Sequence, residues 1–552
     1  MDIVLVGLPG SGKSAVGRRL AHRHGATFLD LDERIETDAG RTIPEIFADE
    51  GEAAFRTMER RAVADLGPAD PDPAIARIIA SGGGAVVDPR NRWALYRDRV
   101  SIWLDGRPEV LAQRLRRSPR VRPLVAGGDP IGAVRDLGVK RERFYAAAAI
   151  RIAGVAEVPD VIRTIEDRLA EDRSASGTTL LRAETAIGRV VLGDGIATSE
   201  VAAALERLKA RRAILLSEPG AWDAFGLGVA TGLRLAGWTV ETILLPQGED
   251  AKRLSVVEGT ARDLVRLRVE RGEPLVAIGG GALGDAAGFV AATYLRGVPL
   301  IHVPTTLVAQ IDSSIGGKTG VDLPEGKNLV GAFHLPEATI IDTTALRTLP
   351  VRQRRAALGE AVKMAALGDE RLFELLETDG ADIAAGPPAH DADGSGAAAV
   401  AEVVERCAWA KVEVVLADQR EHDPTGGRIT LNLGHSVGHA LEATAGYSEL
   451  LHGEAVAYGL RAACSIGQAV GVTPATRADR ITHLLDRLGL ATDPVPYPLQ
   501  SVLGHLASDK KHAAGALRWV LPTEDGVLVR SGIESEVVER AVLPLLAVAA
   551  AR

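Results

Sequence analysis

The first residues whose types and spacing could bind a ligand form the run Gly7-Leu8-Pro9-Gly10-Ser11-Gly12-Lys13-Ser14. This run fits the pattern G-x-x-x-x-G-K-[ST], in which backbone N–H groups of a glycine-rich turn bind a phosphate at the start of a helix. Lys13 can reach the terminal phosphates of a nucleotide, and the Ser14 hydroxyl can bind Mg²⁺. An apolar run (residues 3–6) precedes the turn and a helical pattern (residues 15–24) follows it, as the motif requires. The sequence therefore predicts a nucleoside triphosphate site, and the motif leaves the acceptor open.

Carboxylates, arginines and a second glycine run then indicate which kind of molecule accepts the phosphoryl group. Asp30 and Asp32 stand two residues apart at the end of a predicted strand, which puts them on one face, where one can bind Mg²⁺ and the other a substrate hydroxyl. Arg56 precedes Glu59 by three residues, close enough to pair on a helix. The other candidates are Gly82, Gly83 and Gly84 after a strand, where backbone can approach a ligand closely, and the basic residues Arg122 and Arg141.

Histidines and a glutamate in the second half of the chain predict a metal site. His435 and His439 are four residues apart, on one face of a helix, and His452 follows thirteen residues after His439. Glu360 lies upstream, inside a helical pattern. One glutamate and two histidines suit a catalytic Zn²⁺ that keeps positions open for substrate. His302, His334 and His512 have no such neighbours in the sequence, so we expect them not to bind metal.

A second glycine-rich turn follows the predicted strand 275–278. Gly279, Gly281 and Gly284 satisfy G-x-G-x-x-G, but residues 286–311 contain no Asp or Glu, so the acidic residue expected for the ribose of a dinucleotide is missing. We expect a variant pyrophosphate site there. Many cations accompany the predicted metal site and favour a phosphorylated anionic substrate: Arg296, Lys318, Lys327, Lys411, Arg428 and Lys510-Lys511.

The elements that must position these residues alternate between apolar runs and amphipathic segments. Residues 1–170 predict a parallel sheet with helices on both faces, and a polar stretch, 171–178, predicts a linker. A second α/β pattern begins near residue 188, and helical patterns dominate after about residue 345. A net charge of −9 argues against general nucleic-acid binding, and two cysteines exclude a disulfide framework. With no membrane-length apolar run and no targeting segment, we expect a cytoplasmic protein without a membrane partner.

Residues 1–170 resemble shikimate kinase, through the glycine-rich turn, Asp30 and Asp32, Arg56 and Glu59, Gly82–Gly84, Arg122 and Arg141. The resemblance implies that Asp32 holds the shikimate 3-hydroxyl and is the candidate base, and that Arg122 belongs to a lid over the phosphates. It implies Lys13, Asp32 and Arg122 as catalytic residues and Ser14 and Asp30 as Mg²⁺ ligands. It further implies an ATP site of Gly10, Ser11, Gly12, Lys13, Ser14, Ala15 and Arg122, and a shikimate site of Asp32, Arg56, Gly82, Gly83, Gly84 and Arg141. Arg143 departs from the family, where many members have an uncharged residue.

From about residue 180 the chain resembles 3-dehydroquinate synthase, mainly through residues 312–320, 360–363 and 432–439. Together, the two resemblances imply four segments: a P-loop NTPase-type domain (1–170), a linker (171–179), an α/β NAD-binding domain (180–345) and a mainly helical metal and substrate domain (346–552). It implies that Glu360, His435 and His452 bind Zn²⁺ or Co²⁺, and that Asp312, Lys318, Lys363 and His439 are catalytic. The implied NAD residues are Glu249, Lys252, Gly280, Gly281, Asp285, Thr305, Thr306, Lys318 and Lys327. The implied substrate residues are Arg296, Asp312, Lys318, Asn328, Lys363, Lys411, Arg428, Asn432, His439 and Lys511.

The resemblance also implies a reaction in which NAD⁺ oxidises a secondary alcohol, phosphate leaves, the hydride returns and the ring recloses, so that the net reaction is a phosphate elimination. The implied substrates are shikimate, ATP and heptulosonate 7-phosphate, and the implied assembly is a homodimer through the synthase part. Two departures stand out: Ser217-Glu218-Pro219 replaces an Asp-containing ribose-binding turn, and residues 421–428 form a longer loop. Two alternatives remain open, a small-metabolite kinase fused to a polyol or alcohol dehydrogenase, and a kinase part that acts only as a nucleotide-binding regulator.

Overall fold

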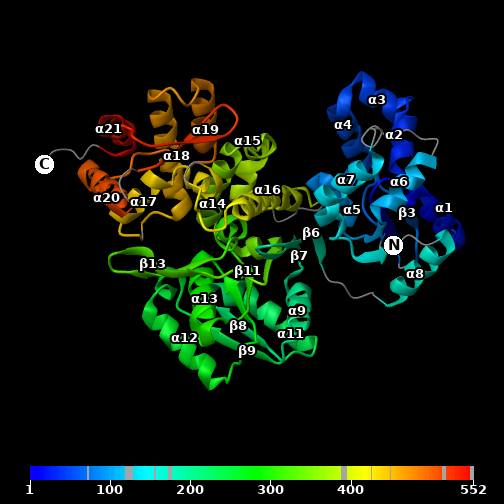
Figure 1. Cartoon of the computed structure of the whole chain (residues 1–552), viewed down its shortest axis with the longest axis horizontal. Coiled ribbons are helices and arrows are strands. Elements are labelled where there is room, and N and C mark those ends of the chain that lie inside the picture. The colour runs from blue at the N-terminus through cyan, green and yellow to red at the C-terminus, as the bar shows by residue number, and fades with distance from the viewer. Residues whose placement is uncertain are drawn as a thin grey trace. The chain divides into compact units, whose positions relative to one another are not determined.

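The computed structural model divides into two compact units, residues 1–185 with 189–200, and residues 186–188 with 201–552 (Figure 1). The residues it describes are 1–70, 72, 74–117, 129–154, 157–171, 177–386, 394–423, 426–447, 449–512 and 517–547. Most of the predicted linker lies outside these ranges, so the predicted domain boundaries stay a prediction. Among the helices in the described ranges, none combines the length and apolar character needed to cross a membrane.

The first unit is built on a five-stranded parallel sheet with the strand order β2-β3-β1-β4-β5. Alternate residues of the central strand, Ile3 and Leu5, pack against Val16 and Leu20 of α1 in one apolar core. The strands are β1 (Asp2–Val6), β2 (Thr27–Asp30), β3 (Arg77–Ala80), β4 (Val100–Asp105) and β5 (Ile150–Ala153). The helices are α1 (Lys13–His24), α2 (Leu31–Ala39), α3 (Ile43–Asp49), α4 (Gly51–Ala64), α5 (Pro89–Tyr96), α6 (Pro108–Arg117), α7 (Pro130–Tyr145) and α8 (Val158–Glu171).

The second unit begins with a parallel sheet in which five strands follow the order β14-β11-β10-β8-β9. Its central strands are buried throughout, as the continuous apolar runs predict. The strands are β8 (Ala213–Ser217), β9 (Val240–Leu244), β10 (Leu275–Gly279), β11 (Leu300–Pro304) and β14 (Ala338–Asp342), with the antiparallel hairpin β12 (Lys318–Leu323) and β13 (Gly326–Phe333). The helices here include α11 (Leu227–Leu235), α12 (Leu254–Arg266) and α13 (Gly281–Thr293). Earlier in the chain, β6 (Thr178–Thr185) and most of β7 (Gly188–Asp194) are assigned to the first unit, and α9 (Ala197–Arg207) spans the boundary at residue 200.

Helices form the rest of the second unit, so the predicted fold class, a P-loop α/β domain followed by α/β and helical parts, is confirmed (Figure 1). They are α14 (Val351–Ala366), α15 (Glu370–Ala385), α16 (Ser395–Ala417), α17 (His435–Thr444), α18 (His452–Ala469), α19 (Ala475–Arg487), α20 (Leu499–His512) and α21 (Ser535–Val542). A short hairpin, β15 (Trp519–Pro522) and β16 (Val527–Arg530), lies near the C-terminal end of the chain.

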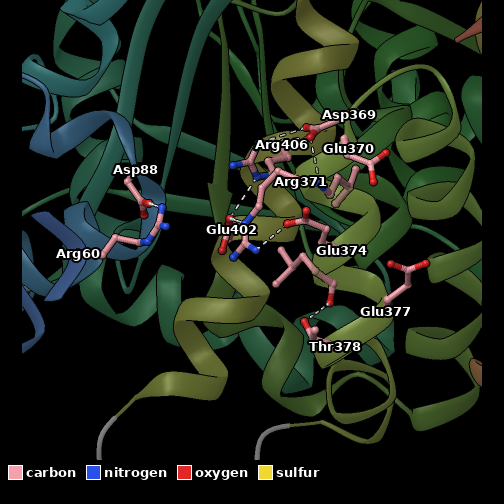
Figure 2. A network of polar contacts seen from close by, with 12 residues as sticks. Arg60, Asp88, Asp369, Glu370, Arg371, Glu374, Glu377, Thr378, Glu402 and Arg406 are labelled. Atoms are coloured by element: carbon pink, nitrogen blue, oxygen red, sulfur yellow. Dashed lines mark hydrogen bonds and ion pairs between the residues drawn. The ribbon is translucent and has the colours of Figure 1, made fainter. Parts of the chain in front are cut away.

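A polar network joins α15 to α16, the helix that carries Lys411 (Figure 2). The Glu402 side chain is only 2% exposed, and it accepts hydrogen bonds from Arg371 Nε at 3.3 Å and from Arg406 Nε at 3.2 Å. Arg406 also pairs with Asp369 at 3.3 Å. Because a buried carboxylate that loses its cations costs about 3–5 kcal/mol, this network helps to fix the orientation of α16.

Candidate active sites

The glycine-rich turn of the first unit takes a shape that requires glycine. Gly7, Gly10 and Gly12 have φ of +143°, +83° and +92°, and a Cβ at Gly7 would lie 2.7 Å from the Leu104 carbonyl oxygen. Lys13 opens α1 and folds over the turn, where its Nζ donates to Gly7 O at 2.7 Å and to Leu8 O at 3.2 Å. The backbone is therefore shaped to surround a phosphate, with the lysine ammonium at its rim.

Ser14 and Asp30 are in direct contact, since Ser14 Oγ donates to Asp30 Oδ2 at 2.6 Å. The other oxygen of Asp30 caps α2 and accepts from the backbone N of Asp32 at 3.1 Å and of Glu33 at 3.4 Å. The strand therefore ends at Asp30, and Asp32 lies in the first turn of α2. The prediction that strand periodicity puts both aspartates on one face was wrong, because the capping carboxylate starts the helix one residue earlier than Asp32.

Asp32 nevertheless reaches the second glycine run. A Cβ placed on Gly82 would lie 2.6 Å from Asp32 Oδ1 and 2.9 Å from Glu59 Oε1, so the two carboxylates converge on this backbone. Burial raises the pKa of Glu59, although Arg56 opposes this shift. Arg56 Nη1 donates to Glu59 Oε2 at 2.8 Å, and Nη2 donates to Glu52 Oε1 at 2.8 Å.

Two arginines flank the glycines. A Cβ on Gly84 would collide with the Arg56 guanidinium, and Arg141 Nη1 donates to Gly83 O at 2.9 Å. Tyr145, one turn further along α7, donates its hydroxyl to the same Gly83 oxygen. The structure thus brings together the predicted acceptor residues Asp32, Arg56, Gly82–Gly84 and Arg141. Ala15 is exposed in the first turn of α1, and Arg122 lies outside the described residues.

In the second unit, Glu360 on α14 faces His435 at the start of α17 and His452 at the start of α18. One ligand atom from each of the three lies within 4.8 Å of the others. Glu360 Oε1 lies 3.3 Å from His452 Nε2 and 3.5 Å from His435 Nε2. The Glu360 carboxylate is fully buried, and Lys363 Nζ forms an ion pair with its Oε2 while Oε1 faces the two imidazoles. A buried carboxylate that faces two imidazoles fits a divalent metal ion.

The far side of each imidazole is already engaged. His435 Nδ1 contacts Leu433 O at 3.0 Å, and His452 Nδ1 contacts Glu442 Oε2 at 3.1 Å, so both Nε2 atoms point to the metal position. Burial lowers the pKa of His435 to about 3, which keeps this imidazole neutral. Burial also opposes protonation of His452, but Glu360 and Glu442 raise its pKa to about 10. His439 lies beside the pair, with its ring 5.2 Å from that of His435 and 5.9 Å from that of His452.

Glycines bring the ligand-bearing helices into backbone contact. A Cβ on Gly453, next to His452, would overlap the carbonyl of Ala356 on α14, and one on Gly359, next to Glu360, would overlap the carbonyl of Gly453. A Cβ on Gly459 would overlap the carbonyl of Gly434, next to His435, and one on Gly438 would lie 3.2 Å from Ala455 O. The spacing of the ligands therefore rests on contacts between main chains.

Lys363 connects the metal position to a buried cluster of charges. Its Nζ lies 3.7 Å from Asp312 Oδ1, and Lys411 Nζ donates to the same oxygen at 2.6 Å. Burial opposes ionisation of Asp312, but Lys411 and Lys363 lower its pKa to about 2. Three of the predicted substrate residues thus lie together next to the predicted metal ligands.

Glu421, which was not among the predicted site residues, accepts hydrogen bonds from two more of the predicted substrate residues. Lys318 Nζ donates to Glu421 Oε2 at 2.7 Å, and Asn432 Nδ2 donates to Oε1 at 3.1 Å. Arg428 is buried and donates to Gly316 O at 3.1 Å and Gln419 O at 2.8 Å. The available signal was a carboxylate at the start of the longer loop 421–428, which ends at the predicted substrate residue Arg428.

The predicted dinucleotide residues gather around the turn after β10. Glu218 Oε1 accepts from Gly280 N at 3.2 Å, and Oε2 accepts from Gly248 N at 2.7 Å, so this carboxylate braces the turn. Thr305 N donates to Gly279 O at 2.9 Å, and Thr306 lies 3.2 Å from a Cβ built on Gly280. A small cavity beneath the turn is lined by Gly279–Gly281, Gly284, Ser313 and His302, and burial lowers the pKa of His302 to about 4.

Lys252 is buried and donates to Asp285 Oδ2 at 2.9 Å and to the Asn328 side-chain oxygen. Burial raises the pKa of Asp285 to about 6, although Lys252 opposes the shift. Asn328, predicted to face the substrate, therefore contacts residues predicted for NAD. Lys327 pairs with Glu249 at 3.1 Å. Arg296 is exposed at the end of the short 3-10 turn that follows α13, with φ of +67°, and the side chain of Lys511 lies outside the described residues.

The comparisons with known proteins cover both parts of the chain. Residues 9–170 match the family model of shikimate kinase, residues 242–356 the 3-dehydroquinate synthase N-terminal model and residues 357–512 the 3-dehydroquinate synthase C-terminal model. The 3-dehydroquinate synthase of Symbiobacterium thermophilum is 43% identical over 321 residues, which cover 58% of this chain and 86% of that protein. The 3-dehydroquinate synthase of Crocosphaera subtropica is 39% identical over 333 residues, which cover 60% of this chain and 88% of that protein.

A solved structure of another enzyme is similar to the second part. It is 2-epi-5-epi-valiolone synthase from Streptomyces hygroscopicus subsp. jinggangensis 5008, with NAD⁺ and Zn²⁺ bound; it is 29% identical, with a TM-score of 0.58 over 68% of this chain and 99% of that one. Both resemblances predicted from the motifs are confirmed by the family models. The chain therefore belongs to the 3-dehydroquinate synthase family and carries a shikimate kinase domain in front of its synthase domains.

Proposed function

We propose that the two parts catalyse two separate reactions. The first is the ATP-dependent phosphorylation of shikimate at its 3-hydroxyl. The second is the NAD- and metal-dependent conversion of 3-deoxy-D-arabino-heptulosonate 7-phosphate to 3-dehydroquinate and phosphate. These reactions are not consecutive in their chemistry, since the product of one is not the substrate of the other. Because the two parts lie on one chain, fusion would supply the two activities in equal amounts.

The convergence of Asp32, Arg56 and Arg141 on one glycine run supports the first reaction. Two guanidinium groups suit a planar carboxylate, and Asp32 stands where it can accept a hydroxyl proton from the same substrate. Ser14 and Asp30 would hold Mg²⁺ between them, and Lys13 would neutralise the phosphate oxygens. Phosphoryl transfer depends on positioning and charge neutralisation, which these residues provide.

The second reaction is carried by one observation, the direct contact between the Glu360 metal cluster and the Lys363–Asp312–Lys411 cluster. The bound metal supplies polarisation of a substrate oxygen, and the bound NAD supplies a hydride acceptor that is regenerated in each turnover. Lys363 and Lys411 bind and orient the anionic groups of the substrate, and Asp312 holds both ammonium groups in place. A polyol would need no such buried cations, which disfavours the polyol dehydrogenase alternative.

The intact chain should release phosphate from the heptulosonate without accumulating NADH, and should form ADP when it is given shikimate and ATP. NADH accumulation without phosphate release would favour the dehydrogenase alternative. ATP-dependent phosphate release without shikimate turnover would favour the regulator alternative. We also propose a homodimer through the synthase part, which sedimentation of the intact chain would test. The two buried free cysteines, Cys407 and Cys464, accord with a cytoplasmic location.

A further inference from the structure

Glu442 has no role in the proposed chemistry, yet it lies on the face of α17 that bears His435 and His439. It follows His439 by three residues and His435 by seven, which is one face of the helix. The residue is only 4% exposed. Its Oε2 contacts Nδ1 of His452 at 3.1 Å, on the side of the imidazole away from Glu360. Its Oε1 lies 3.7 Å from Nζ of Lys327.

Lys327 belongs to the α/β part of the unit and not to the helices. It lies on β13, and its Nζ donates to Oε1 of Glu249 at 3.1 Å. The same ammonium lies 4.8 Å from the ring centre of Tyr447. Lys327 and Glu249 are both in the predicted NAD set, whereas Glu442 touches a predicted metal ligand. One buried carboxylate is therefore shared between the two predicted sites.

We propose that Glu442 is a positioning residue that couples binding of the metal to binding of NAD, a proposal that rests on the proposed synthase function. Glu442 orients His452 through Nδ1, so that Nε2 faces the metal position. The Lys327 ammonium attracts the negative charge of the same carboxylate, which weakens Glu442 as a hydrogen-bond acceptor for His452. When the dinucleotide engages Lys327, Glu442 becomes a stronger acceptor for His452, and Nε2 becomes a stronger donor to the metal.

The coupling has a definite sign. NAD tightens metal binding, and the metal tightens NAD binding by the same factor, because linkage between two binding equilibria is reciprocal. Two variants distinguish the contact of Glu442 with His452 from its contact with Lys327. Glu442→Gln keeps the shape of the side chain but removes the charge that both neighbours share. Lys327→Met removes the cation and leaves the His452 contact in place.

The test uses the intact, metal-free chain and measures Zn²⁺ affinity by competition with a chromogenic chelator, with and without saturating NAD⁺. In the wild type we expect NAD⁺ to tighten Zn²⁺ binding about 5–10-fold, near the low end of known couplings. Glu442→Gln should weaken Zn²⁺ about 10–100-fold, the range for losing such an outer carboxylate, and should abolish the effect of NAD⁺. Lys327→Met should bind Zn²⁺ more tightly than the wild type without NAD⁺, and NAD⁺ should add nothing.

Glu449→Gln is the matched control, because Glu449 is an exposed carboxylate three residues before His452 that accepts a hydrogen bond from Tyr497 at 2.9 Å. It should behave as the wild type in both measurements. Zn²⁺ affinity of Glu442→Gln within twofold of the wild type would overturn the proposal, as would a persisting effect of NAD⁺ in Lys327→Met. A wild type that releases phosphate, but whose Zn²⁺ affinity does not change with NAD⁺, would overturn the role proposed for Glu442 and leave the proposed function intact. A wild type that binds neither ligand and releases no phosphate would overturn the proposed function as well.

Discussion

Replacing Arg56 with alanine tests the kinase site and its energetics together. Glu59 has a side chain that is 2% exposed, and Arg56 Nη1 is its cation at 2.8 Å. Loss of one partner of a buried ion pair costs about 3–5 kcal/mol. Because the Arg56 side chain is 22% exposed and solvent weakens such a pair, we expect about 2–3 kcal/mol. Glu59→Gln in the same chain should recover most of this loss, since the orphaned charge is then gone.

The loss should also depend on pH. Burial already raises the pKa of Glu59 in the folded protein, and removal of Arg56 raises it further. A carboxyl whose folded-state pKa exceeds its unfolded value stabilises the fold below the unfolded pKa, and this stability is lost as pH rises through the folded pKa. The penalty of Arg56→Ala should therefore be larger at pH 8 than at pH 5, and Glu59→Gln should remove the difference.

Hydrogen–deuterium exchange of α4 in the intact chain measures the local free energy, and coupled assays measure the two activities. Shikimate phosphorylation should fall by at least about 10³-fold, because the proposed contact of Arg56 with the substrate carboxylate is lost, while phosphate release from the heptulosonate stays within twofold. Equal exchange of α4 in both proteins at pH 8 would refute the role given to the Arg56–Glu59 pair. Loss of both activities would refute the separation of the two sites.

Three further outcomes follow from the same geometry. Removal of metal by a chelator should stop phosphate release, and Zn²⁺ or Co²⁺ should restore it; release that is insensitive to the chelator would remove the metal role of Glu360, His435 and His452. Gly459→Ala should lower the melting temperature, because overpacking costs about 1–3 kcal/mol or more, whereas Gly504→Ala, where the added Cβ meets no atom within 4 Å, should not. Asp30→Asn should raise the Mg²⁺ concentration needed for half-maximal shikimate phosphorylation without changing phosphate release, and an unchanged Mg²⁺ requirement would exclude Asp30 as a ligand.

The features predicted best were those with local causes. The glycine-rich turn needs only a strand, a turn and a helix in order, and its glycines adopt the positive φ values that the pattern implies. The face shared by His435 and His439 follows from helical spacing alone. Buried parallel strands were equally visible as short apolar runs.

The misses lie where contacts come from distant parts of the chain. Asp32 is an exception with a local cause: the spacing of Asp30 and Glu33 is a helix-start signal, but the apolar run before Asp30 favoured a strand through Asp32. Glu421 and Glu442 look like surface charges in the sequence, and only the fold brings them to Lys318 and His452. The contact between Asn328 and Lys252 likewise joins residues 76 positions apart in the sequence, and the substrate role of Asn328 stays a prediction.

The glycine contacts between α14, α17 and α18 have a consequence for how the synthase site can change. Where side chains separate two helices, a smaller or larger residue moves them apart or together in small steps. Here peptide groups touch, so the distance between Glu360, His435 and His452 has no side chain to adjust it. An ion of a different size must be accommodated by rotation of the ligands themselves. We therefore expect the spacing of the three ligands, which is one determinant of the ion they accept, to change little when side chains elsewhere in the core are substituted.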